Sequence, residues 1–143
     1  MAARLFNEYS TGKPGYMLDD TFKFKYKFED RVKEANNIRS KYPERVPVIV
    51  ERQPNANVPI IDKNKYLVPN DLTVGQFMYV IRKRMKLPPE QALFIFVQRE
   101  FPNRSSIMPN QACLMSTIYD ESRDKDGFLY VNYTGENTFG CSK

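Results

Sequence analysis

The 143-residue chain has the length of one domain, and 22 Lys and Arg against 17 Asp and Glu give it a net charge of +5. It has no histidine and two cysteines, Cys113 and Cys141, which excludes Cys-His and Ser-His-Asp nucleophiles, Cys/His zinc sites and a disulfide framework. We therefore predict that it is not an enzyme, with no catalytic residues, no metal and no cofactor. The longest apolar run, Ala92–Val97, is far shorter than the ~20 residues of a membrane span, and residues 1–20 lack a signal-peptide run. These features predict a cytoplasmic protein.

Basic side chains gather in two segments. Residues 21–45 carry eight basic and four acidic side chains, and residues 82–86 add four basic ones. Such runs of basic residues usually lie on a face of the protein that is exposed to solvent. The more specific alternative is a surface that binds acidic peptides or anionic lipid. Nucleic acid is a further alternative, testable by the salt dependence of binding. No Gly-rich or aromatic RNA-binding motif interleaves the basic residues, so we expect no nucleic-acid partner.

The first part of the chain predicts one helix after a loose start. Residues 1–20 show no hydrophobic periodicity, which indicates a flexible N-terminal extension. Residues 22–27 alternate aromatic and Lys, a pattern open to a strand, a short helix or an extended arm. Apolar residues then recur at three- and four-residue steps from 28 to 42, as in an amphipathic helix, and Pro43 ends it.

Two strands and a helix follow. Residues 46–50 are strongly β-prone, residues 53–57 have turn chemistry, and residues 65–69 form a second strand ended by proline. A helix begins after Thr73, its expected cap, and its apolar stripe runs to Met85 with basic residues in the last turns, which suits the helix dipole.

The remaining segments predict two more strands. Residues 93–97 are nearly all apolar, as in a buried central strand, and residues 99–110 form a polar loop. Residues 112–119 suggest a short helix, and residues 128–133 the last strand. This order predicts an α+β fold with a single mixed four-stranded sheet whose helices cover one face.

Several long strings of the chain resemble the ubiquitin-like autophagy modifiers, the family of the GABA-receptor-associated protein. These strings are Ile38–Glu51, Asp62–Phe77, Asp124–Val131 and Tyr133–Gly140. The resemblance covers roughly residues 22–140 and implies a β-grasp (ubiquitin-like) fold with extra N-terminal helices. It also implies domain boundaries: an extension over 1–20, a ubiquitin-like domain with an N-terminal helical subdomain over 21–134, and a flexible C-terminal tail over 135–143. The chain departs from the family in its extension, in a longer loop from Gln98 to about Gln111, and in its last three residues.

The resemblance implies how the tail is used. A processing cysteine protease would cut between Gly140 and Cys141. Activating and conjugating enzymes would then pass the Gly140 carboxylate, as a thioester, to the amine of phosphatidylethanolamine. A terminal glycine suits this chemistry because it has no side chain to shield its carbonyl. The resemblance thus implies a monomeric modifier in the cytoplasm that reaches autophagosome and vacuolar or lysosomal membranes after lipidation.

The resemblance also implies a groove for cargo receptors that carry an aromatic-x-x-aliphatic motif. The peptide would pair with the edge of the strand at 65–68 by β-augmentation. The implied aromatic pocket comprises Glu34, Ile38, Pro47, Lys65, Leu67 and Phe128. The implied aliphatic pocket comprises Tyr66, Val68, Pro69, Leu72, Phe77, Val80 and Arg84. The implied receivers of acidic flanking residues are Arg45, Lys63, Lys65 and Arg84.

Two alternatives stay open at this stage. The apolar members of both pockets would be core residues in any fold with this pattern, whereas Lys65 and Arg84 are expected to face water or a partner. A ubiquitin-like interaction domain that is never conjugated would have the groove but would not need an exposed Gly140. The extension could fold back into the groove, but it contains no aromatic-x-x-aliphatic motif, so we expect a disordered tail.

Overall fold

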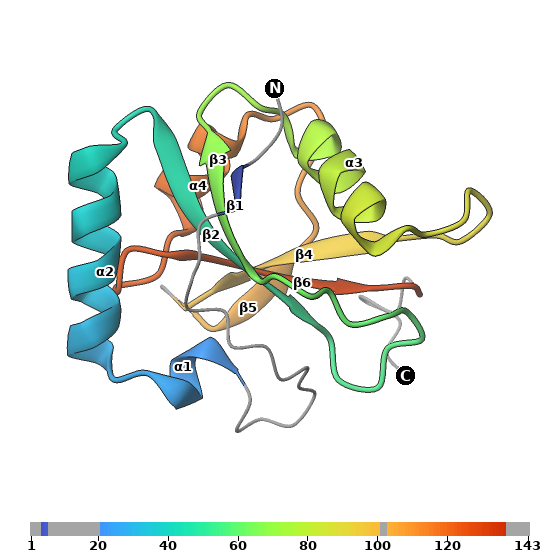
Figure 1. The fold of residues 1–143 in the computed structure, drawn as a ribbon, viewed down its shortest axis with the longest axis horizontal. Coiled ribbons are helices and arrows are strands. Elements are labelled where there is room, and N and C mark those ends of the chain that lie inside the picture. The colour runs from blue at the N-terminus through green and yellow to red at the C-terminus, as the bar shows by residue number, and fades with distance from the viewer. Residues whose placement is uncertain (1–3, 6–20, 101–102, 137–143) are drawn as a thin grey trace.

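A computed structural model describes residues 4–5, 21–100 and 103–136 of the chain. The predictions for Gly140 and Cys141, and for most of the extension, lie outside these residues. Within them, four helices surround one sheet (Figure 1). None of the described helices is long and apolar enough to cross a membrane.

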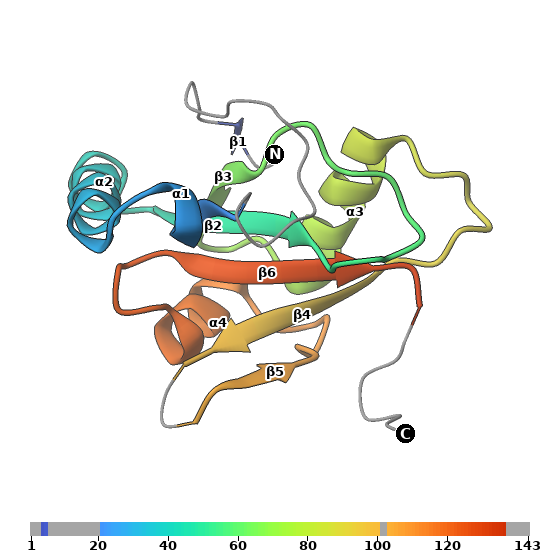
Figure 2. The same ribbon diagram turned by 90° about the horizontal axis from the view of Figure 1, so that it is seen from below.

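The sheet has six strands in the order β1-β3-β2-β6-β4-β5. Their bounds are β1 Arg4–Leu5, β2 Arg45–Arg52, β3 Lys65–Pro69, β4 Phe94–Arg99, β5 Ser105–Ile107 and β6 Leu129–Thr134. The central pair, β2 and β6, is parallel, and the other neighbours are antiparallel, so the sheet is mixed as predicted. Figure 2 shows β6 running between β2 and β4.

The predicted count of four strands is too low, because each edge of the sheet carries one short additional strand. β5 lies in the predicted polar loop and pairs with β4, with Val97 opposite Ile107. β1 lies in the predicted disordered extension and pairs with β3. Two or three residues with one side toward solvent carry too little hydrophobic pattern to be recognised as strands.

Capping residues in the sequence set the ends of the helices. They are α1 Phe22–Lys25, α2 Phe28–Lys41, α3 Val74–Met85 and α4 Met115–Ser122. Thr73 caps α3 as predicted, in a capping box with Gln76, and Lys86 ends that helix in a left-handed conformation (φ 57°). The segment left open at residues 22–27 is a short helix.

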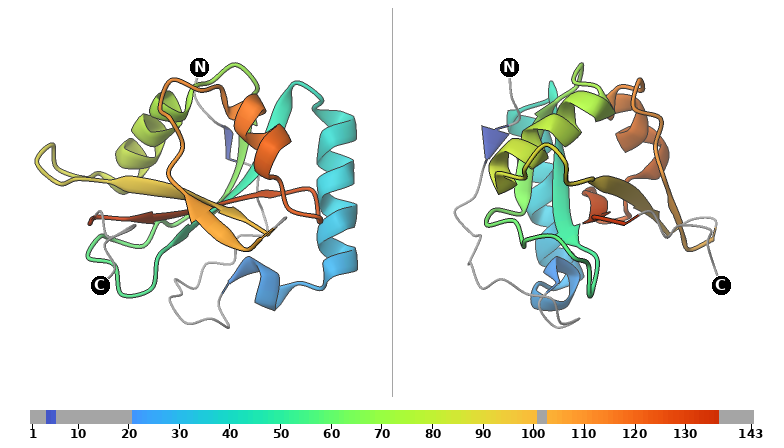
Figure 3. Two further views of the ribbon diagram at one scale, coloured as in Figure 1. Left: turned by 180° about the vertical axis from the view of Figure 1, so that it is seen from behind. Right: turned by 90° about the vertical axis from the view of Figure 1, so that its right-hand side faces the viewer.

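Alternate residues of the strands belong to two different hydrophobic clusters, so both faces of the sheet are covered. Val48 of β2 belongs to the larger cluster with residues of α3 and α4, whereas its neighbour Ile49 belongs to the smaller one with residues of α1 and α2. Successive side chains of a strand point to opposite faces, which accounts for the division. The expectation of helices on one face is therefore wrong, because the N-terminal helices pack on the other. In Figure 3, α2 stands at one end of the sheet and α3 at the other.

Buried charges fix the N-terminal helices to the sheet. Arg31 of α2 is buried and its Nε donates to Oδ2 of Asp126 at 2.8 Å. The backbone N–H of Phe22 donates to Oε2 of Glu51 at 2.7 Å, and burial raises the pKa of that carboxyl. The Phe22 ring meets Phe128 edge-on at 5.2 Å between centroids. These contacts hold α1 and α2 against the smaller cluster.

Candidate functional site

The strand β3 separates the two predicted pockets. One of its sides pairs with β2, where Pro47 lies opposite Leu67 and Val48 opposite Tyr66. Its side chains alternate between the clusters: Leu67 belongs to the smaller one, and Tyr66 and Val68 belong to the larger one. The two faces of this single strand therefore carry the two sets of residues that the sequence assigns to two pockets.

The residues predicted for the aromatic pocket are brought together on the α2 face of β3. Ile38, Leu67 and Phe128 belong to the smaller cluster, and Pro47 is buried beside Leu67. Glu34 joins them through Lys65, whose Nζ lies 3.0 Å from Glu34 Oε2. The grouping predicted from the sequence is thus present in space.

Lys65 itself differs from the prediction that it faces water or a partner molecule. Its side chain is only 2% exposed, and its partner Glu34 belongs to the same chain. Its ammonium also lies 4.9 Å from the Phe22 ring centroid and 5.6 Å from that of Tyr26. Two aromatic rings and a carboxylate offset the cost of burying the charge. Neither aromatic ring was part of the predicted pocket, because their effect on Lys65 depends on where α1 packs.

The residues predicted for the aliphatic pocket gather on the α3 face. Tyr66, Val68, Leu72 and Phe77 are buried in the larger cluster, and Tyr66 meets Phe77 edge-on at 5.8 Å between centroids. The remaining members, Pro69, Val80 and Arg84, are half-buried at the rim.

Tyr66 carries an unusual polar group into this face. Its hydroxyl is buried and has no hydrogen-bond partner among the described residues, and burial raises the pKa of the phenol well above its ordinary value. A buried donor without a hydrogen-bond partner costs stability.

The predicted basic rim is partly occupied by acids of the chain itself. Arg84 of α3 makes a two-point contact with Asp62, at 2.9 Å from Nε and 3.1 Å from Nη2. The hydrogen bond from Arg84 lowers the pKa of Asp62. Arg45 contacts Glu44 at 3.8 Å, and Lys63 is half-exposed. An acidic peptide would have to compete with Asp62 for Arg84.

The outer side of β3 is occupied by β1, which the sequence analysis missed. Arg4 lies opposite Leu67 and Leu5 opposite Tyr66, in antiparallel register. The extension contains no aromatic-x-x-aliphatic motif that would predict this pairing from anchoring side chains. Pairing through the main chain needs no such side chains and leaves no motif in the sequence.

Comparisons with known proteins place this arrangement in a family. The family model described as autophagy protein Atg8, ubiquitin-like, matches residues 30–140. Autophagy-related protein 8 of Mycosarcoma maydis is 59% identical over 123 residues, covering 86% of this chain and 98% of the relative. The chain belongs to the Atg8 family. Autophagy-related protein 8d of Arabidopsis thaliana is 56% identical over 87% of this chain and 98% of the relative. Autophagy-related protein 8 of Schizosaccharomyces pombe is also 56% identical, over 83% of this chain and 93% of the relative.

Membership in the Atg8 family confirms the resemblance found in the sequence and the ubiquitin-like α+β fold. It identifies the chain as an autophagy-related ubiquitin-like protein. The roles of individual groove residues, and of Gly140 and Cys141, stay predictions.

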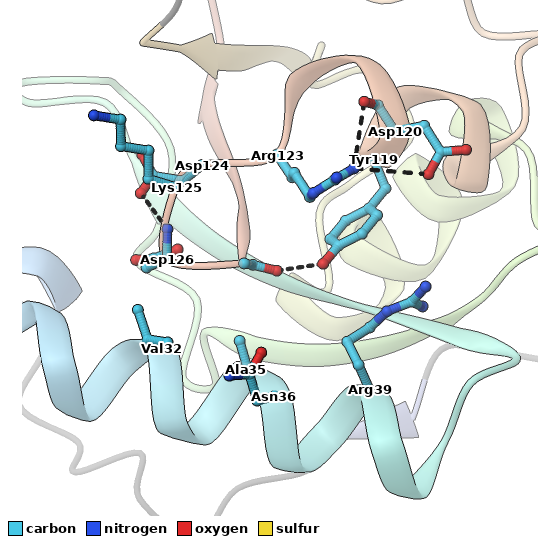
Figure 4. Close-up of a pocket in the computed structure, with 11 residues that line it drawn as sticks. Val32, Ala35, Asn36, Arg39, Tyr119, Asp120, Arg123, Asp124, Lys125 and Asp126 are labelled. Atoms are coloured by element: carbon cyan, nitrogen blue, oxygen red, sulfur yellow. Dashed lines mark hydrogen bonds and ion pairs between the residues drawn. The ribbon is translucent and has the colours of Figure 1, made fainter.

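A separate cavity of about 470 Å³ lies between α2 and the segment that leads from α4 into β6 (Figure 4). Its centre is Tyr119, whose hydroxyl donates to the carbonyl of Gly127, with the guanidiniums of Arg39 and Arg123 at 5.1 and 5.5 Å from the ring centroid. The acids of its lining are engaged: Asp126 contacts Arg31, and Asp124 contacts Lys23 at 2.7 Å. These contacts join α2 to the segment that leads into β6. They do not indicate a particular ligand.

Proposed function

We propose that the chain is a ubiquitin-like modifier of autophagy, trimmed to expose Gly140 and conjugated to phosphatidylethanolamine. In this proposal it acts as a membrane-tethered adaptor, not an enzyme, and recruits cargo receptors to the autophagosome. It starts in the cytoplasm and reaches autophagosome and vacuolar or lysosomal membranes after lipidation. One observation carries the adaptor role: two apolar clusters meet at β3, one on each of its faces.

The spacing of the expected peptide motif fits this arrangement. In an extended peptide, side chains an even number of residues apart point to the same face, and side chains three residues apart point to opposite faces. A peptide lying along the outer side of β3 would therefore direct its aromatic residue toward Leu67 and its aliphatic residue toward Tyr66 and Val68. This geometry supports a preference for aromatic-x-x-aliphatic motifs over motifs with an even spacing.

The strength of binding follows from the size of the contacts. Two apolar anchors stabilise a complex by about 1.5–3 kcal/mol each, and a few strand hydrogen bonds add about 1 kcal/mol each. Ordering a peptide opposes this gain, so the expected affinity is roughly micromolar.

Besides the activation of the Gly140 carboxylate to a thioester, driven by cleavage of a nucleoside triphosphate, the tail chemistry needs one hydrolysis and one acyl transfer. Water would cleave the Gly140–Cys141 peptide bond at the protease, releasing the tripeptide Cys141–Lys143 and leaving a Gly140 carboxylate. After activation as a thioester, the amine of phosphatidylethanolamine would attack the Gly140 carbonyl, the thiolate would leave, and an amide would form. Both steps require access to a carbonyl, which glycine leaves unshielded.

The experiment that tests the conjugation compares Gly140→Ala with a matched control, Ser142→Ala, in cells with induced autophagy. The control and the unchanged protein should co-sediment with membranes and shift on gels that separate lipid-modified protein. Gly140→Ala should stay in the soluble fraction at its full mass. A membrane-bound, lipid-modified Gly140→Ala protein would overturn the assignment. A soluble, uncut wild-type protein would favour the non-conjugated interaction domain.

A further inference from the structure

The strand β1 lies where the proposed peptide would bind. β3 has two hydrogen-bonding sides, one of which is taken by β2 from Arg45 opposite Pro69 to Ile49 opposite Lys65. The other side is paired with β1 through Arg4 opposite Leu67 and Leu5 opposite Tyr66. Figure 1 shows β1 beside β3, at the edge of the sheet.

β1 and a docked peptide exclude each other for a simple reason. The N–H and C=O groups of Leu67 point to the outer side of β3, because those of its neighbours Tyr66 and Val68 point to β2, and they can pair with one neighbouring strand at a time. The two residues that β1 covers belong one to each predicted pocket, because Tyr66 faces the larger cluster and Leu67 the smaller one. A peptide reaching both pockets must therefore cross the stretch that β1 occupies.

The chain length favours β1 in this competition. Fifteen residues, 6 to 20, connect β1 to the domain, and even a fully extended connection of this length reaches only about 50 Å. A segment tethered this closely competes at an effective concentration on the order of millimolar. A receptor peptide of roughly micromolar affinity would therefore displace β1 from part of the molecules and not from all of them.

The contact is also short enough to be reversible. Two paired residues supply few hydrogen bonds, each with a modest net effect on stability. The occupied state can therefore be the major state of the free protein and still give way to a peptide that adds two apolar anchors.

We propose that the segment Arg4–Leu5 is an intramolecular competitor that occupies the outer side of β3 and lowers the affinity of the chain for receptor peptides. The proposal rests on the peptide-binding function proposed above and adds a regulatory element to it. The population of the open state sets the apparent affinity, because the observed dissociation constant is the intrinsic one divided by the open fraction.

The test uses the full chain and two double variants. Arg4→Pro with Leu5→Pro removes both N–H groups of β1 and disfavours its pairing. Ser10→Pro with Thr11→Pro is the matched control, since it places two prolines in the same extension and leaves Arg4 and Leu5 unchanged. The probe is a short peptide with aspartates before a tryptophan-x-x-leucine core, titrated by calorimetry. Hydrogen exchange at the Leu67 amide, which points toward β1, reports the pairing independently of any peptide.

The proposal predicts that Arg4→Pro with Leu5→Pro binds the peptide about three- to tenfold more tightly than the unchanged chain, while the control does not. Exchange at the Leu67 amide should become faster in the same variant, exchange at the Tyr66 amide should not, and the melting temperature should not change. Equal affinity in all three proteins would overturn the competitor and leave the groove assignment standing. If none of the proteins binds, the groove assignment fails as well, and faster exchange would then show only that β1 pairs with β3.

Discussion

The ammonium of Lys65 on β3 lies 3.0 Å from the carboxylate of Glu34 on α2, and this lysine is almost fully buried. The contact joins a residue of the sheet to the second of the two N-terminal helices. Because Lys65 also lies over the Phe22 and Tyr26 rings, one side chain links β3, α1 and α2. The buried charge of Lys65 thus helps to position the residues predicted for the aromatic pocket.

This link predicts an asymmetry between its two ends. Glu34→Gln leaves the Lys65 charge buried without its partner and should lower the free energy of unfolding by about 2–4 kcal/mol. Lys65→Met removes the charge and keeps an unbranched chain against the rings, so its cost should stay below about 1.5 kcal/mol. Urea unfolding of both variants and of the double variant measures the difference. Equal costs for the two single changes would contradict this account of the pair.

Glu51 should make stability fall as pH rises. Burial raises the pKa of this carboxyl above its ordinary value of 4.5, so the folded protein holds the proton more strongly than the unfolded chain. Its contribution is fully present below the unfolded pKa and is lost as pH rises through the folded pKa. Glu51→Gln does not titrate and can still accept the N–H of Phe22. Its stability relative to wild type should therefore increase as pH rises above the ordinary value of 4.5.

The control for this pH effect is Asp62, whose pKa is lowered by Arg84. Its contribution is present above its unfolded value and is lost as pH falls, so Asp62→Asn should show the opposite trend at acid pH. The pair is exposed to solvent, and the effect should be less than about 1 kcal/mol. Chemical unfolding across the pH range checks both. The same sign of pH dependence in the two variants would rule out the assigned causes.

Two glycines should respond in opposite directions to alanine. Gly127 has φ +97°, and an added Cβ would lie 2.8 Å from the Cβ of Ala35, so Gly127→Ala should cost about 1–3 kcal/mol. Gly75 lies in the first turn of α3, where an added Cβ would come no closer than 3.4 Å to Gln111. Gly75→Ala should be neutral or stabilise by up to about 1 kcal/mol, since alanine favours helix. Thermal and urea unfolding of the two variants decide the matter, and a destabilised Gly75→Ala would count against the packing described for α3.

The rim of the groove predicts a dependence on the peptide's charge. Asp62→Asn removes the carboxylate that Arg84 contacts and leaves the guanidinium for a peptide. Binding of an acidic-flanked peptide should then strengthen about two- to fivefold, as expected for an exposed ion pair of up to about 1 kcal/mol. Binding of the same peptide with a neutral flank should not change. Calorimetry at low and high salt distinguishes binding of the acidic-flanked peptide from binding of the neutral one, because salt screens only the contact between Arg84 and the acidic flank. Equal gains for both peptides would remove Arg84 from the list of residues that recognise the flank.

The sequence predicted the elements that carry a long hydrophobic pattern. The helices at α2 and α3 and the strands at β2, β3 and β6 lie where periodicity and the proline at 43 place them. It also grouped Ile38, Leu67 and Phe128 correctly, but through family resemblance, since each alone is an ordinary core residue. The burial of Tyr66 and Leu67 has a practical consequence. Alanine at either position would remove core contacts, so rim residues such as Arg84 are better probes of binding.

The features that the sequence did not predict depend on long-range packing. Lys65 was expected to face water or a partner because lysine is rarely buried, and its burial needs Glu34, Phe22 and Tyr26 to converge on it from other parts of the chain. β1 and β5 were missed because two- and three-residue strands owe their existence to the neighbour they pair with. The choice of sheet face for the N-terminal helices likewise depends on Phe22 meeting Phe128, a contact between residues far apart in the sequence.

The proposed function is tested most directly by the mass of the C-terminal peptide of the protein isolated from membranes of cells with induced autophagy. The account predicts a peptide that ends at Gly140, lacks Cys141–Lys143 and carries phosphatidylethanolamine in an amide bond. A membrane fraction in which the peptide still ends at Lys143, without lipid, would contradict it.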